Sequence, residues 1–334
     1  MTETGTLKVC IAGAGAIGCT VAARLAMAGI SVNVLARGAA LNAIAQNGIA
    51  LTDLDGEHRV SVSASNQAGE FGIQDIIFVC TKAQALGRIL PDLSPMIGPD
   101  TVLIPMVNGV PWWYFHGDGG RFEGRRVQAL DPNGELEQAV PFKHIVGCVV
   151  FITSEVMAPG VVKSSTPHLL IFGEPNNTCS ERLERIKALF DASGIEARTT
   201  DRIRDPLWAK MIANLTSNPL SVVTRAPLQD IYTEPGLKRI AIKMLHEGLA
   251  VSAAYGARIQ YDPHTFMELA AGMGDVRTSM LQDFDKGIAL ELAAIGDAFM
   301  ELAQLMDMEM PVTRDIVSMA RFLGQQRERE VVKA

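Results

Sequence analysis

A glycine-rich segment near the N-terminus constrains the fold more than any other feature of the chain. Gly13, Gly15 and Gly18 directly follow the apolar run Val9 to Ala12 and open a helix-prone stretch. In a strand–turn–helix unit, the first glycine permits a tight turn, the second lets the backbone approach a pyrophosphate, and the third lets helix and strand pack closely. A second β-type run, Ser31 to Leu35, follows at the distance that a βαβ unit requires.

This arrangement predicts a dinucleotide-binding βαβ unit. The start of the helix, at Ala16 and Ile17, presents free N–H groups and the positive end of the helix dipole to a pyrophosphate. Because 30 glycines in 334 residues also produce chance spacings, the alternative is a structural turn that binds nothing. The strand-like and helix-prone segments on either side favour a nicotinamide dinucleotide.

The end of the second predicted strand indicates which dinucleotide is bound. An NAD-binding unit places a carboxylate about 20 residues beyond the glycines, where it holds the free ribose 2′-hydroxyl. This chain has Leu35-Ala36-Arg37 at that point, without an acid. The guanidinium fork of Arg37 suits a 2′-phosphate, whereas the alternative is an ordinary surface arginine. We therefore expect NADPH to be favoured over NADH.

The composition is that of a folded, acidic, two-domain protein. The 334 residues are too many for one ordinary core and fit two domains of ~150 residues each. Hydrophobic residues make up 48% and charged residues 20%, with a formal charge of −7, which argues against disorder and against nucleic-acid binding. Phosphate groups must then be bound locally, through Arg37 and Lys82.

The cysteine and histidine patterns argue against disulfides and metal sites. The five cysteines are an odd number without CxxC spacing and lie mostly in apolar runs, as buried thiols of a reducing compartment do. The six histidines lack HExxH or similar spacing, so we expect no metal. We see no apolar core of a signal peptide and no apolar run approaching ~20 residues. These features predict a cytoplasmic protein without a membrane partner.

Up to residue 200, short β-branched runs alternate with helical or turn segments, which predicts a doubly wound parallel sheet. The predicted parallel strands are Leu7 to Ala12, Ser31 to Leu35, Asp75 to Cys80, Thr101 to Pro105 and Arg126 to Leu130. Three later runs without helices between them predict an antiparallel extension, at Ile145 to Thr153, Gly160 to Ser164 and His168 to Phe172. The fold class is therefore α/β, with residues 1–200 as a Rossmann-type NADP-binding domain.

Residues 201–334 have a different sequence pattern, which predicts an all-helical domain; the candidate residues described below make it the expected substrate and catalytic domain. Long amphipathic stretches replace the β-branched runs. Asp205-Pro206 and Asp262-Pro263 each place an N-cap residue before a proline at the first helical position. The fold class as a whole is thus a Rossmann-type sheet followed by a helical C-terminal domain.

Polar residues follow two of the predicted strands. Thr81-Lys82 comes directly after one strand, and Asn108-Gly109 follows another. In open α/β sheets, ligands bind outside the carboxyl ends of the strands. Lys82 can reach cofactor or substrate as a point charge, and Asn108 can donate and accept hydrogen bonds near a nicotinamide. The alternative is that these strands simply end in polar residues.

A polar stripe is expected in the helical domain. Lys210, Asn214 and Asn218 are spaced four and four, so a helix places them along one face, among apolar neighbours. A lysine in such surroundings is desolvated, which lowers its pKa and suits it to deliver a proton. The alternative is a solvated face. Pro219 is expected to kink this helix immediately after the stripe.

A second polar island runs from Thr278 to Asp283 and includes Ser279. Glu291 follows at the start of a predicted apolar helix, Ile288 to Met306. The periodicity leaves open whether Glu291 faces the core or water.

These polar segments, in this order, resemble those of the ketopantoate reductases, the 2-dehydropantoate 2-reductases, over nearly the whole chain. The resemblance is carried by Gly13 to Gly18, Arg37, Thr81-Lys82, Asn108-Gly109, Trp208 to Asn214 with Asn218-Pro219-Leu220, and Ser279 to Asp283 with Glu291. The glycine motif is common to many folds. The combination of the last two runs is much more specific.

The resemblance implies hydride transfer from C4 of NADPH to the ketone carbon of a 2-oxo acid, a reaction of pantothenate biosynthesis. Lys210 would be the general acid that hydrogen-bonds the ketone oxygen, stabilises the developing alkoxide and supplies its proton. Asn214, Asn218 and Ser279 are similar to substrate-orienting groups. Glu291 would accept a substrate hydroxyl and act as a partner of Lys210 in catalysis.

Two further residues complete the implied site. Lys82 and Asn108 are similar to contacts on the cofactor side, and Asn108 is expected to touch the substrate as well. The expected partner is a small-molecule 2-oxo acid. A homodimer formed through the helical domain is a hypothesis based on the apolar content of that domain.

Two departures from the family pattern bear on the substrate. After Glu291 the chain reads Leu292 to Asp297, where such proteins usually carry an acid and an Asn-Gly pair. The run Pro111 to His116, with a glycine-rich tail, is an insertion relative to shorter members and serves as a lid, a subunit contact or packing. The alternatives are therefore a reductase of another 2-oxo acid and, from a different class, a non-catalytic NADP(H)-binding redox sensor.

Overall fold

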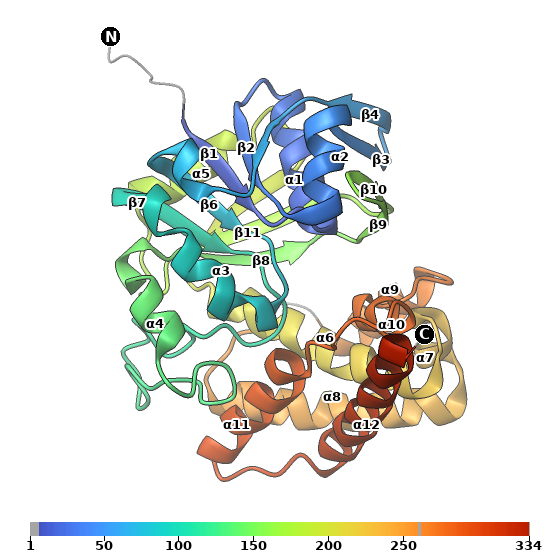
Figure 1. Cartoon of the computed structure of the whole chain (residues 1–334). Coiled ribbons are helices and arrows are strands. Elements are labelled where there is room, and N and C mark those ends of the chain that lie inside the picture. Colours follow the sequence, from blue (N-terminus) through green and yellow to red (C-terminus); the bar gives the residue numbers. More distant parts are fainter. Residues whose placement is uncertain (1–6, 260–261, 334) are drawn as a thin grey trace. The chain divides into compact units, whose positions relative to one another are not determined.

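The computed structural model describes residues 7–259 and 262–333. They form two compact units (Figure 1). The first contains residues 7–107, 113–125 and 134–203, and the second contains residues 108–112, 126–133 and the described part of 204–333. The predicted domain 1–200 begins before the first described residue, and the predicted domain 201–334 ends one residue after the last. They also assign 108–112 and 126–133 to the first domain, whereas these segments cluster with the second unit.

The first unit is built on a five-stranded parallel sheet. Its strand order is β5-β2-β1-β6-β7, and each neighbouring pair runs parallel. The strands are β1 (Val9–Ala12), β2 (Val32–Leu35), β5 (Ser63–Ser65), β6 (Gln74–Val79) and β7 (Ile97–Pro105). The chain winds outward from β1 to β5 and then returns to place β6 on the other side of β1. This doubly wound order confirms the predicted fold class and makes the carboxyl ends of β1 and β6 the switch point where such sheets bind ligands.

The helix after the glycines is buried on two sides. The parallel sheet is flanked by α1 (Ala16–Met27), α2 (Gly38–Asn47) and α3 (Leu86–Asp92). The four residues of β1 are fully buried, as expected for a central strand covered on both faces. Helix α1 also packs against the four strands of a second sheet, where Thr20 Oγ1 lies 2.9 Å from Ser154 Oγ.

Two further sheets, of order β4-β3-β10-β9 and β12-β11-β8, complete the first unit. Their strands are β3 (Ile49–Asp53), β4 (Gly56–Val60), β8 (Gly147–Phe151), β9 (Ser154–Ala158), β10 (Val161–Ser164), β11 (Leu169–Gly173) and β12 (Glu196–Thr200). Of the predicted late strands, β8 and β11 pair antiparallel with each other, whereas β10 pairs antiparallel with β9, a strand that was not predicted. They lie in these separate sheets, and an isolated bridge from Leu103 to Ile145 links β7 to the segment before β8.

The predicted strand Arg126 to Leu130 is wrong. This segment forms no strand and belongs to the second unit. The Glu301 carboxylate accepts hydrogen bonds from the backbone N–H groups of Gln128, at 2.9 Å, and Ala129, at 2.8 Å. Only Val127 in this run is β-branched, and a side-chain acceptor takes the place of a strand partner.

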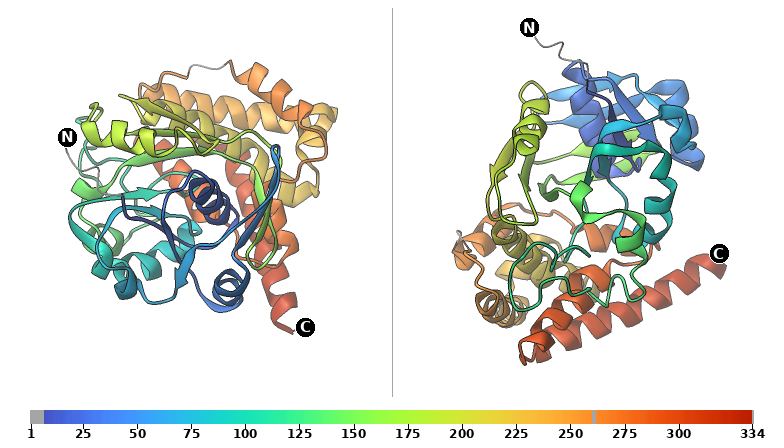
Figure 2. Two further views of the ribbon diagram at one scale, coloured as in Figure 1. Left: turned by 90° about the horizontal axis from the view of Figure 1, so that it is seen from above. Right: turned by 90° about the vertical axis from the view of Figure 1, so that its left-hand side faces the viewer.

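The second unit is helical, as predicted. Its helices are α6 (Arg204–Thr224), α7 (Leu228–Thr233), α8 (Pro235–Ala254), α9 (Pro263–Gly272), α10 (Ser279–Asp285), the π-helical turn η5 (Ala293–Asp297), α11 (Ala298–Leu305) and α12 (Pro311–Lys333). Helix α6 packs against α8, α10 and α12, and Figure 2 shows α12 as the long red helix that runs to the C-terminus. The shorter helices α4 (Glu135–Ala139) and α5 (Glu181–Leu189) belong to the first unit.

The two predicted aspartate caps have different outcomes. Asp262 caps α9 as predicted, because its carboxylate accepts the N–H of Thr265 at 2.8 Å. The prediction for Asp205 is wrong, since α6 already begins at Arg204 and the Asp205 carboxylate accepts the N–H of Arg258 at 3.0 Å. Helix α6 continues past Pro219 to its end at Thr224.

The aromatic insertion is part of the packed interior. Trp112, Trp113, Tyr114 and Phe115 are each 1–2% exposed. Within the first unit, the rings of Tyr114 and Phe115 meet edge to face with centroids 5.0 Å apart. Of the three roles considered for this insertion, such burial supports packing.

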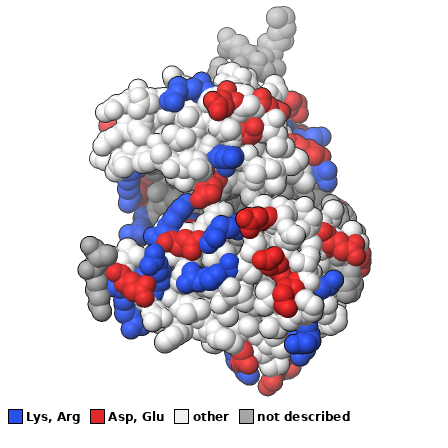
Figure 3. All heavy atoms as spheres, turned by 90° about the vertical axis from the view of Figure 1, so that its right-hand side faces the viewer, with Lys and Arg blue, Asp and Glu red and all other residues white. Residues whose placement is uncertain are grey.

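Charges of both signs are interspersed on the surface. On the face drawn in Figure 3, Lys and Arg side chains lie beside Asp and Glu side chains instead of forming a continuous basic area. Among the described residues, no helix is long and apolar enough to cross a membrane.

A buried ion pair ties α1 to β3. Arg24 and Asp53 lie 2.5 Å apart, and their side chains are 6% and 1% exposed. The Asp55 carboxylate reaches the same guanidinium at 2.7 Å. His168 also belongs to this cluster, and burial together with the charge of Arg24 lowers its pKa. Because α1 carries the glycine turn at its start, this pair helps to fix the turn against the rest of the unit.

We expect Arg24→Met to destabilise the first unit strongly, because it leaves the Asp53 carboxylate buried without its partner. Breaking such a pair costs about 3–5 kcal/mol, which in a unit of this size lowers the melting temperature by roughly 6 °C or more. The measurement is thermal unfolding followed by circular dichroism. The control is Arg198→Met, whose exposed ion pair with Glu196 should contribute less than about 1 kcal/mol. Equal melting temperatures for the two variants would contradict the importance of the buried pair.

Candidate functional site

The glycine turn has the geometry that each glycine was predicted to provide. Gly13 has φ +118°, and a Cβ there would lie 2.8 Å from the carbonyl oxygen of Cys80. A Cβ on Gly18 would lie 2.0 Å from the carbonyl oxygen of Gly13. Both positions therefore exclude larger residues, because the start of α1 is pressed against the turn and the end of β6.

The second glycine leaves space in front of the helix. A Cβ on Gly15 would meet only the Cys80 carbonyl oxygen, at 3.8 Å. The first intrahelical hydrogen bond runs from the N–H of Cys19 to the Gly15 carbonyl, at 2.9 Å, so the N–H groups of Ala16 and Ile17 precede it. Among the residues that the structure describes, no side chain caps this helix, and its first turn contains no acidic residue. These features fit a pyrophosphate at the N-terminus of α1.

Thr81 adds an unsatisfied polar group at the same strand end. Its Oγ1 is buried and finds no hydrogen-bond partner among the residues that the structure describes. Its methyl carbon lies 2.9 Å from the position of a Cβ on Gly13. Lys82 follows directly, partly buried, and precedes the short 3₁₀ turn η2 (Ala83–Ala85). A buried orphan hydroxyl beside the glycine turn is what a bound dinucleotide would satisfy.

Arg37 lies just beyond the carboxyl end of β2. Its guanidinium is paired with the carboxylate of Asp92, at the end of α3, and both side chains are at least half exposed. The predicted contact with a 2′-phosphate therefore has a competitor inside the protein. Sequence reasoning missed Asp92, because the residue lies far along the chain and carries no motif.

Three residues of α6 form the predicted polar stripe in the second unit. Lys210 and Asn214 are partly buried, and Asn218 is 3% exposed. The Asn218 side-chain amide donates to the Asn214 backbone carbonyl at 3.1 Å and lies 3.3 Å from the Asn214 side-chain oxygen. Asn218 thus faces into the protein and the other two side chains are partly covered, which argues against a fully solvated face.

Helix α10 approaches the other side of Asn218. The Asn218 Oδ1 accepts hydrogen bonds from the Ser279 hydroxyl at 3.4 Å and the Met280 N–H at 3.3 Å. Thr278 caps α10, and its Oγ1 lies 2.6 Å from the Oγ of Ser221 on α6. These contacts fix the predicted Ser279 beside the stripe. Thr278 and Ser221 support this arrangement, and sequence reasoning gave them no role.

Asn108 reaches the same stripe from a loop. The Asn214 side-chain amide donates to Asn108 Oδ1 at 3.4 Å. The next residue, Gly109, has φ +82°, and a Cβ there would lie 2.4 Å from the carbonyl oxygen of Ala294. The Val110 N–H donates to that carbonyl at 2.9 Å. The loop is therefore held directly against the turn η5.

Glu291 is buried. It is 5% exposed and lies one turn before Ile295, whose N–H donates to the Glu291 carbonyl at 3.0 Å. This settles the orientation that periodicity left open. The predicted apolar helix from Ile288 begins later, and its first turn, η5, is π-helical, a distortion often found at functional sites.

Burial changes the acidity of the central lysine. Desolvation lowers the pKa of Lys210 from its ordinary value of 10.5 to about 8. At neutral pH the ammonium form is retained but releases its proton readily. The second unit thus gathers Lys210, Asn214, Asn218, Ser279 and Asn108, with Glu291 buried beside the turn that holds Asn108.

The two sets of predicted site residues lie in different units. Gly13, Gly15, Ala16, Ile17, Gly18, Arg37 and Lys82 belong to the first unit, and Lys210, Asn214, Asn218, Ser279, Glu291 and Asn108 belong to the second. Asn108 was predicted from a strand end of the first domain, and its membership of the second unit was not foreseen. Within the described residues, no three His, Cys, Asp or Glu side chains are grouped as metal ligands.

Comparisons with protein families and with individual proteins both find ketopantoate reductases. Residues 9–177 match the family described as ketopantoate reductase PanE/ApbA, and residues 202–324 match ketopantoate reductase PanE/ApbA C terminal. The chain is 36% identical over 322 residues to a 2-dehydropantoate 2-reductase of Mesorhizobium japonicum, covering 96% of this chain and 99% of that protein.

Solved structures show the same similarity. A Ralstonia solanacearum MolK2 protein assigned to the ketopantoate reductases has a TM-score of 0.91 at 35% identity and covers 97% of this chain and 99% of that one. D-mandelate dehydrogenase with NADH and anilino(oxo)acetate has a TM-score of 0.82 at 18% identity, covering 96% and 99%, which shows a shared fold.

We expect Gly13→Ala to weaken NADPH binding at least tenfold. An L side chain disfavours the φ of +118° at this position, and the new Cβ contacts the Cys80 carbonyl, so the turn has to shift away from the phosphates. The measurement is fluorescence titration with NADPH. The control is Gly87→Ala in α3, where a Cβ meets nothing within 4 Å. Unchanged NADPH affinity in Gly13→Ala would contradict a nucleotide-binding role for this turn.

Proposed function

The chain belongs to the ketopantoate reductase family, and from this membership and the site geometry we propose that it reduces 2-dehydropantoate (ketopantoate) to pantoate with NADPH. It is an oxidoreductase of a nicotinamide-dependent family. The observation that carries the specific reaction is the inward-facing stripe of Lys210, Asn214 and Asn218, with the lowered pKa of the lysine. A redox sensor has no need of a desolvated proton donor.

Lys210 is the general acid in this proposal. The nicotinamide, when bound, supplies the hydride. The Lys210 ammonium hydrogen-bonds the ketone oxygen of the substrate, stabilises the negative charge that develops there and transfers its proton to give the hydroxyl group. A pKa of about 8 places this proton transfer close to neutral pH, where a general acid is both protonated and reactive.

The neighbouring side chains orient the substrate. Asn214 and Asn218 hold one another in place, and Ser279 is fixed beside them by its bond to Asn218. Their donors and acceptors suit the carboxylate and hydroxyl groups of a small oxo acid. Glu291 is buried and lies two residues before η5 in the sequence. In this proposal its carboxylate accepts a hydrogen bond from a substrate hydroxyl and acts with Lys210. Asn108 completes the substrate contacts and also serves the cofactor side.

The residues of the first unit hold the cofactor. Gly13, Gly15 and Gly18 admit the pyrophosphate to the start of α1, and Lys82 contributes a positive charge at the end of β6. The buried Thr81 hydroxyl gains a partner when the dinucleotide binds. Arg37 binds the 2′-phosphate and thereby favours NADPH over NADH.

The segment that departs from the family pattern supports the named substrate. Leu292, Ala294 and Ile295 are 1–3% exposed and form the buried side of η5. These side chains therefore pack in the interior, and the proposal leaves the substrate contacts to the residues already named. Reduction of another 2-oxo acid is the alternative outcome of a substrate panel.

Compartment and assembly are further parts of the proposal. The five cysteines are free, four of them buried, which is consistent with a reducing cytoplasm. A homodimer through the helical unit remains a prediction. Met319 and Phe322 of α12 are 47% and 63% exposed and offer an apolar surface there.

We expect kcat/KM for ketopantoate to be constant below pH about 8 and to fall tenfold per pH unit above it, because Lys210 must be protonated in the free enzyme. Lys210→Met should reduce kcat at least 100-fold while NADPH binding persists. The measurement is oxidation of NADPH at 340 nm over a pH series. The control is Lys243→Met, an exposed lysine on α8. A pH profile without this limb, or full turnover by Lys210→Met, would remove Lys210 from the mechanism.

The same lysine gives a readout that does not depend on turnover. Between pH 8 and 10.5 the unfolded chain holds a proton at Lys210 that the folded chain has released, so folded-state stability gains from this residue as pH rises. Below pH 8 the buried ammonium lowers the free energy of unfolding of the protein. Lys210→Met should therefore raise the melting temperature at pH 7, and this gain should shrink toward pH 10.

Arg37→Ala should raise Kd for NADPH at least tenfold and leave Kd for NADH within about twofold, because only NADPH carries the 2′-phosphate. Asp92→Asn should tighten NADPH binding selectively, since it frees the Arg37 guanidinium. Both constants come from fluorescence titrations. The control is Arg59→Ala, an exposed arginine on β4. An equal loss of affinity for NADPH and NADH in Arg37→Ala would show that Arg37 does not bind the 2′-phosphate.

A further inference from the structure

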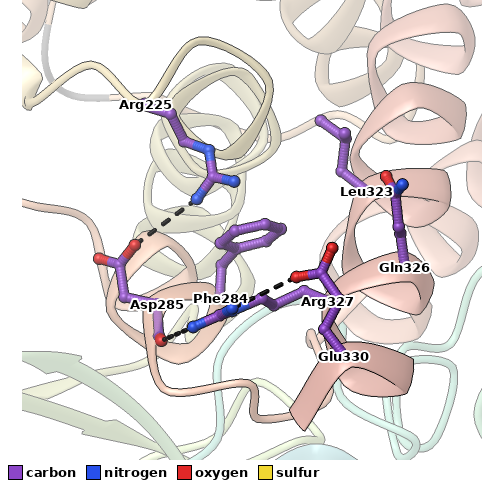
Figure 4. A pocket seen from close by; sticks show the side chains of 7 residues that line it. All are labelled: Arg225, Phe284, Asp285, Leu323, Gln326, Arg327 and Glu330. Atoms are coloured by element: carbon purple, nitrogen blue, oxygen red, sulfur yellow. Dashed lines mark hydrogen bonds and ion pairs between the residues drawn. The ribbon is translucent and has the colours of Figure 1, made fainter. Parts of the chain in front are cut away.

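A surface pocket of about 170 Å³ lies within the second unit, apart from the Lys210 stripe (Figure 4). It is formed where α6 has ended, at the carboxyl end of α10 and along the last turns of α12. Arg225, Phe284 and Arg327 come one from each of these segments. No part of the proposed reaction uses this pocket.

Arg225 occupies a backbone conformation that disfavours its side chain. It is the residue directly after α6 and has φ +62°, with its N–H donating to the Ser221 carbonyl at 2.8 Å. Glycine is the usual residue at this position of a helix end, because it adopts the left-handed region without strain. An arginine kept in such a conformation points to a use for its side chain.

The Arg225 guanidinium packs on an aromatic ring but makes few polar contacts. It stacks on Phe284, with its central carbon 3.6 Å from the ring centroid. Its nearest carboxylate oxygen, Asp285 Oδ1, is 3.6 Å from Nη1, and the other oxygen of Asp285 is bound closely by Arg277. The Arg225 side chain makes no hydrogen bond to any residue that the structure describes, and it is half exposed. Its donor fork therefore faces the pocket ready for an oxyanion.

The other groups around the pocket set the charge of the ligand. Arg327 donates to the Asp285 carbonyl at 3.2 Å and to the Glu330 carboxylate at 3.3 Å. Two arginines and two acids line the pocket, and Arg277 adds a further positive charge against Asp285. The charges of these three arginines and two acids add up to one net positive charge. A single negative charge balances it, whereas a dianion meets repulsion from the two carboxylates.

The remaining side chains that line the pocket indicate the chemistry of the rest of the ligand. Phe284 and Leu323 present apolar surface, and Gln326 offers an amide. A small molecule that places an anionic end on Arg225 therefore covers these apolar side chains with its other end. We propose that this pocket binds a small monocarboxylate with a short apolar body, the carboxylate lying on the Arg225 guanidinium and the body against Phe284 and Leu323.

The position of the pocket gives such a ligand access to the catalytic helices. Helix α6 carries Asn218 and ends at the pocket, and helix α10 carries Ser279 and supplies Phe284 and Asp285 at its other end. A molecule bound there contacts the ends of the two helices that the Asn218 hydrogen bonds join.

Isovalerate is a suitable probe, because it combines one carboxylate with a short branched apolar body. Its binding is measured by saturation-transfer NMR on the full-length protein carrying Lys210→Met, which suppresses binding at the proposed active site. We expect binding in the millimolar range, weakened at least tenfold by Arg225→Gly and by Arg225→Asn. Both replacements tolerate the left-handed conformation. Arg239→Ala, an exposed arginine on α8, should leave binding unchanged.

The melting temperature provides the second readout. Arg225→Gly should raise it, because the relief of backbone strain outweighs the loss of one half-exposed ring contact and one long ion pair. A lower melting temperature with unchanged isovalerate binding would show that Arg225 only supports the fold, and it would overturn the proposal. Inorganic phosphate that binds more tightly than isovalerate at Arg225 would overturn the monocarboxylate assignment.

Discussion

The hydrogen bonds of Asn218 are the constraint on which the catalytic half of the molecule depends. A buried side-chain amide must find partners, because an unsatisfied one costs about 1–3 kcal/mol. Asn218 meets this requirement with Asn214 on its own helix and with Ser279 and the Met280 N–H at the start of α10. One buried residue thus joins α6 and α10 and positions two other polar side chains of the proposed site.

The same surroundings determine the acidity of Lys210. The apolar residues around the stripe pack in the interior, with Trp208, Met211 and Leu215 each no more than 1% exposed. That packing desolvates the lysine and lowers its pKa to about 8. The helix therefore sacrifices stability at neutral pH to hold an ammonium that transfers its proton readily. This is the kind of local conflict between folding and function that active sites show.

The parts of the fold that sequence reasoning predicted are those governed by local patterns. The glycine spacing, the alternation of short strands with helices, the Asp262 cap and the four-residue spacing of the polar stripe all depend on neighbours within one or two turns. The errors have a different origin. Asp205 does not cap α6 because a backbone N–H at Arg258 takes its carboxylate, and Val127 lies in no strand because Glu301 binds the adjacent N–H groups. In both cases a distant partner outweighs the local preference.

Within the site, Gly18 and Gly109 illustrate the difference between a contact that sequence spacing predicts and one that it does not. Each lets a backbone carbonyl approach to a distance that a Cβ would prevent, Gly18 toward Gly13 and Gly109 toward Ala294. The first contact is readable from sequence, because both residues lie in one turn and their spacing is fixed by the strand and helix they join. The second joins a loop after β7 to a π-helical turn near the C-terminus, and no spacing relates them. Asn108 could therefore be suspected from its strand end, but the unit to which it belongs depends on that close approach and on its hydrogen bond with Asn214.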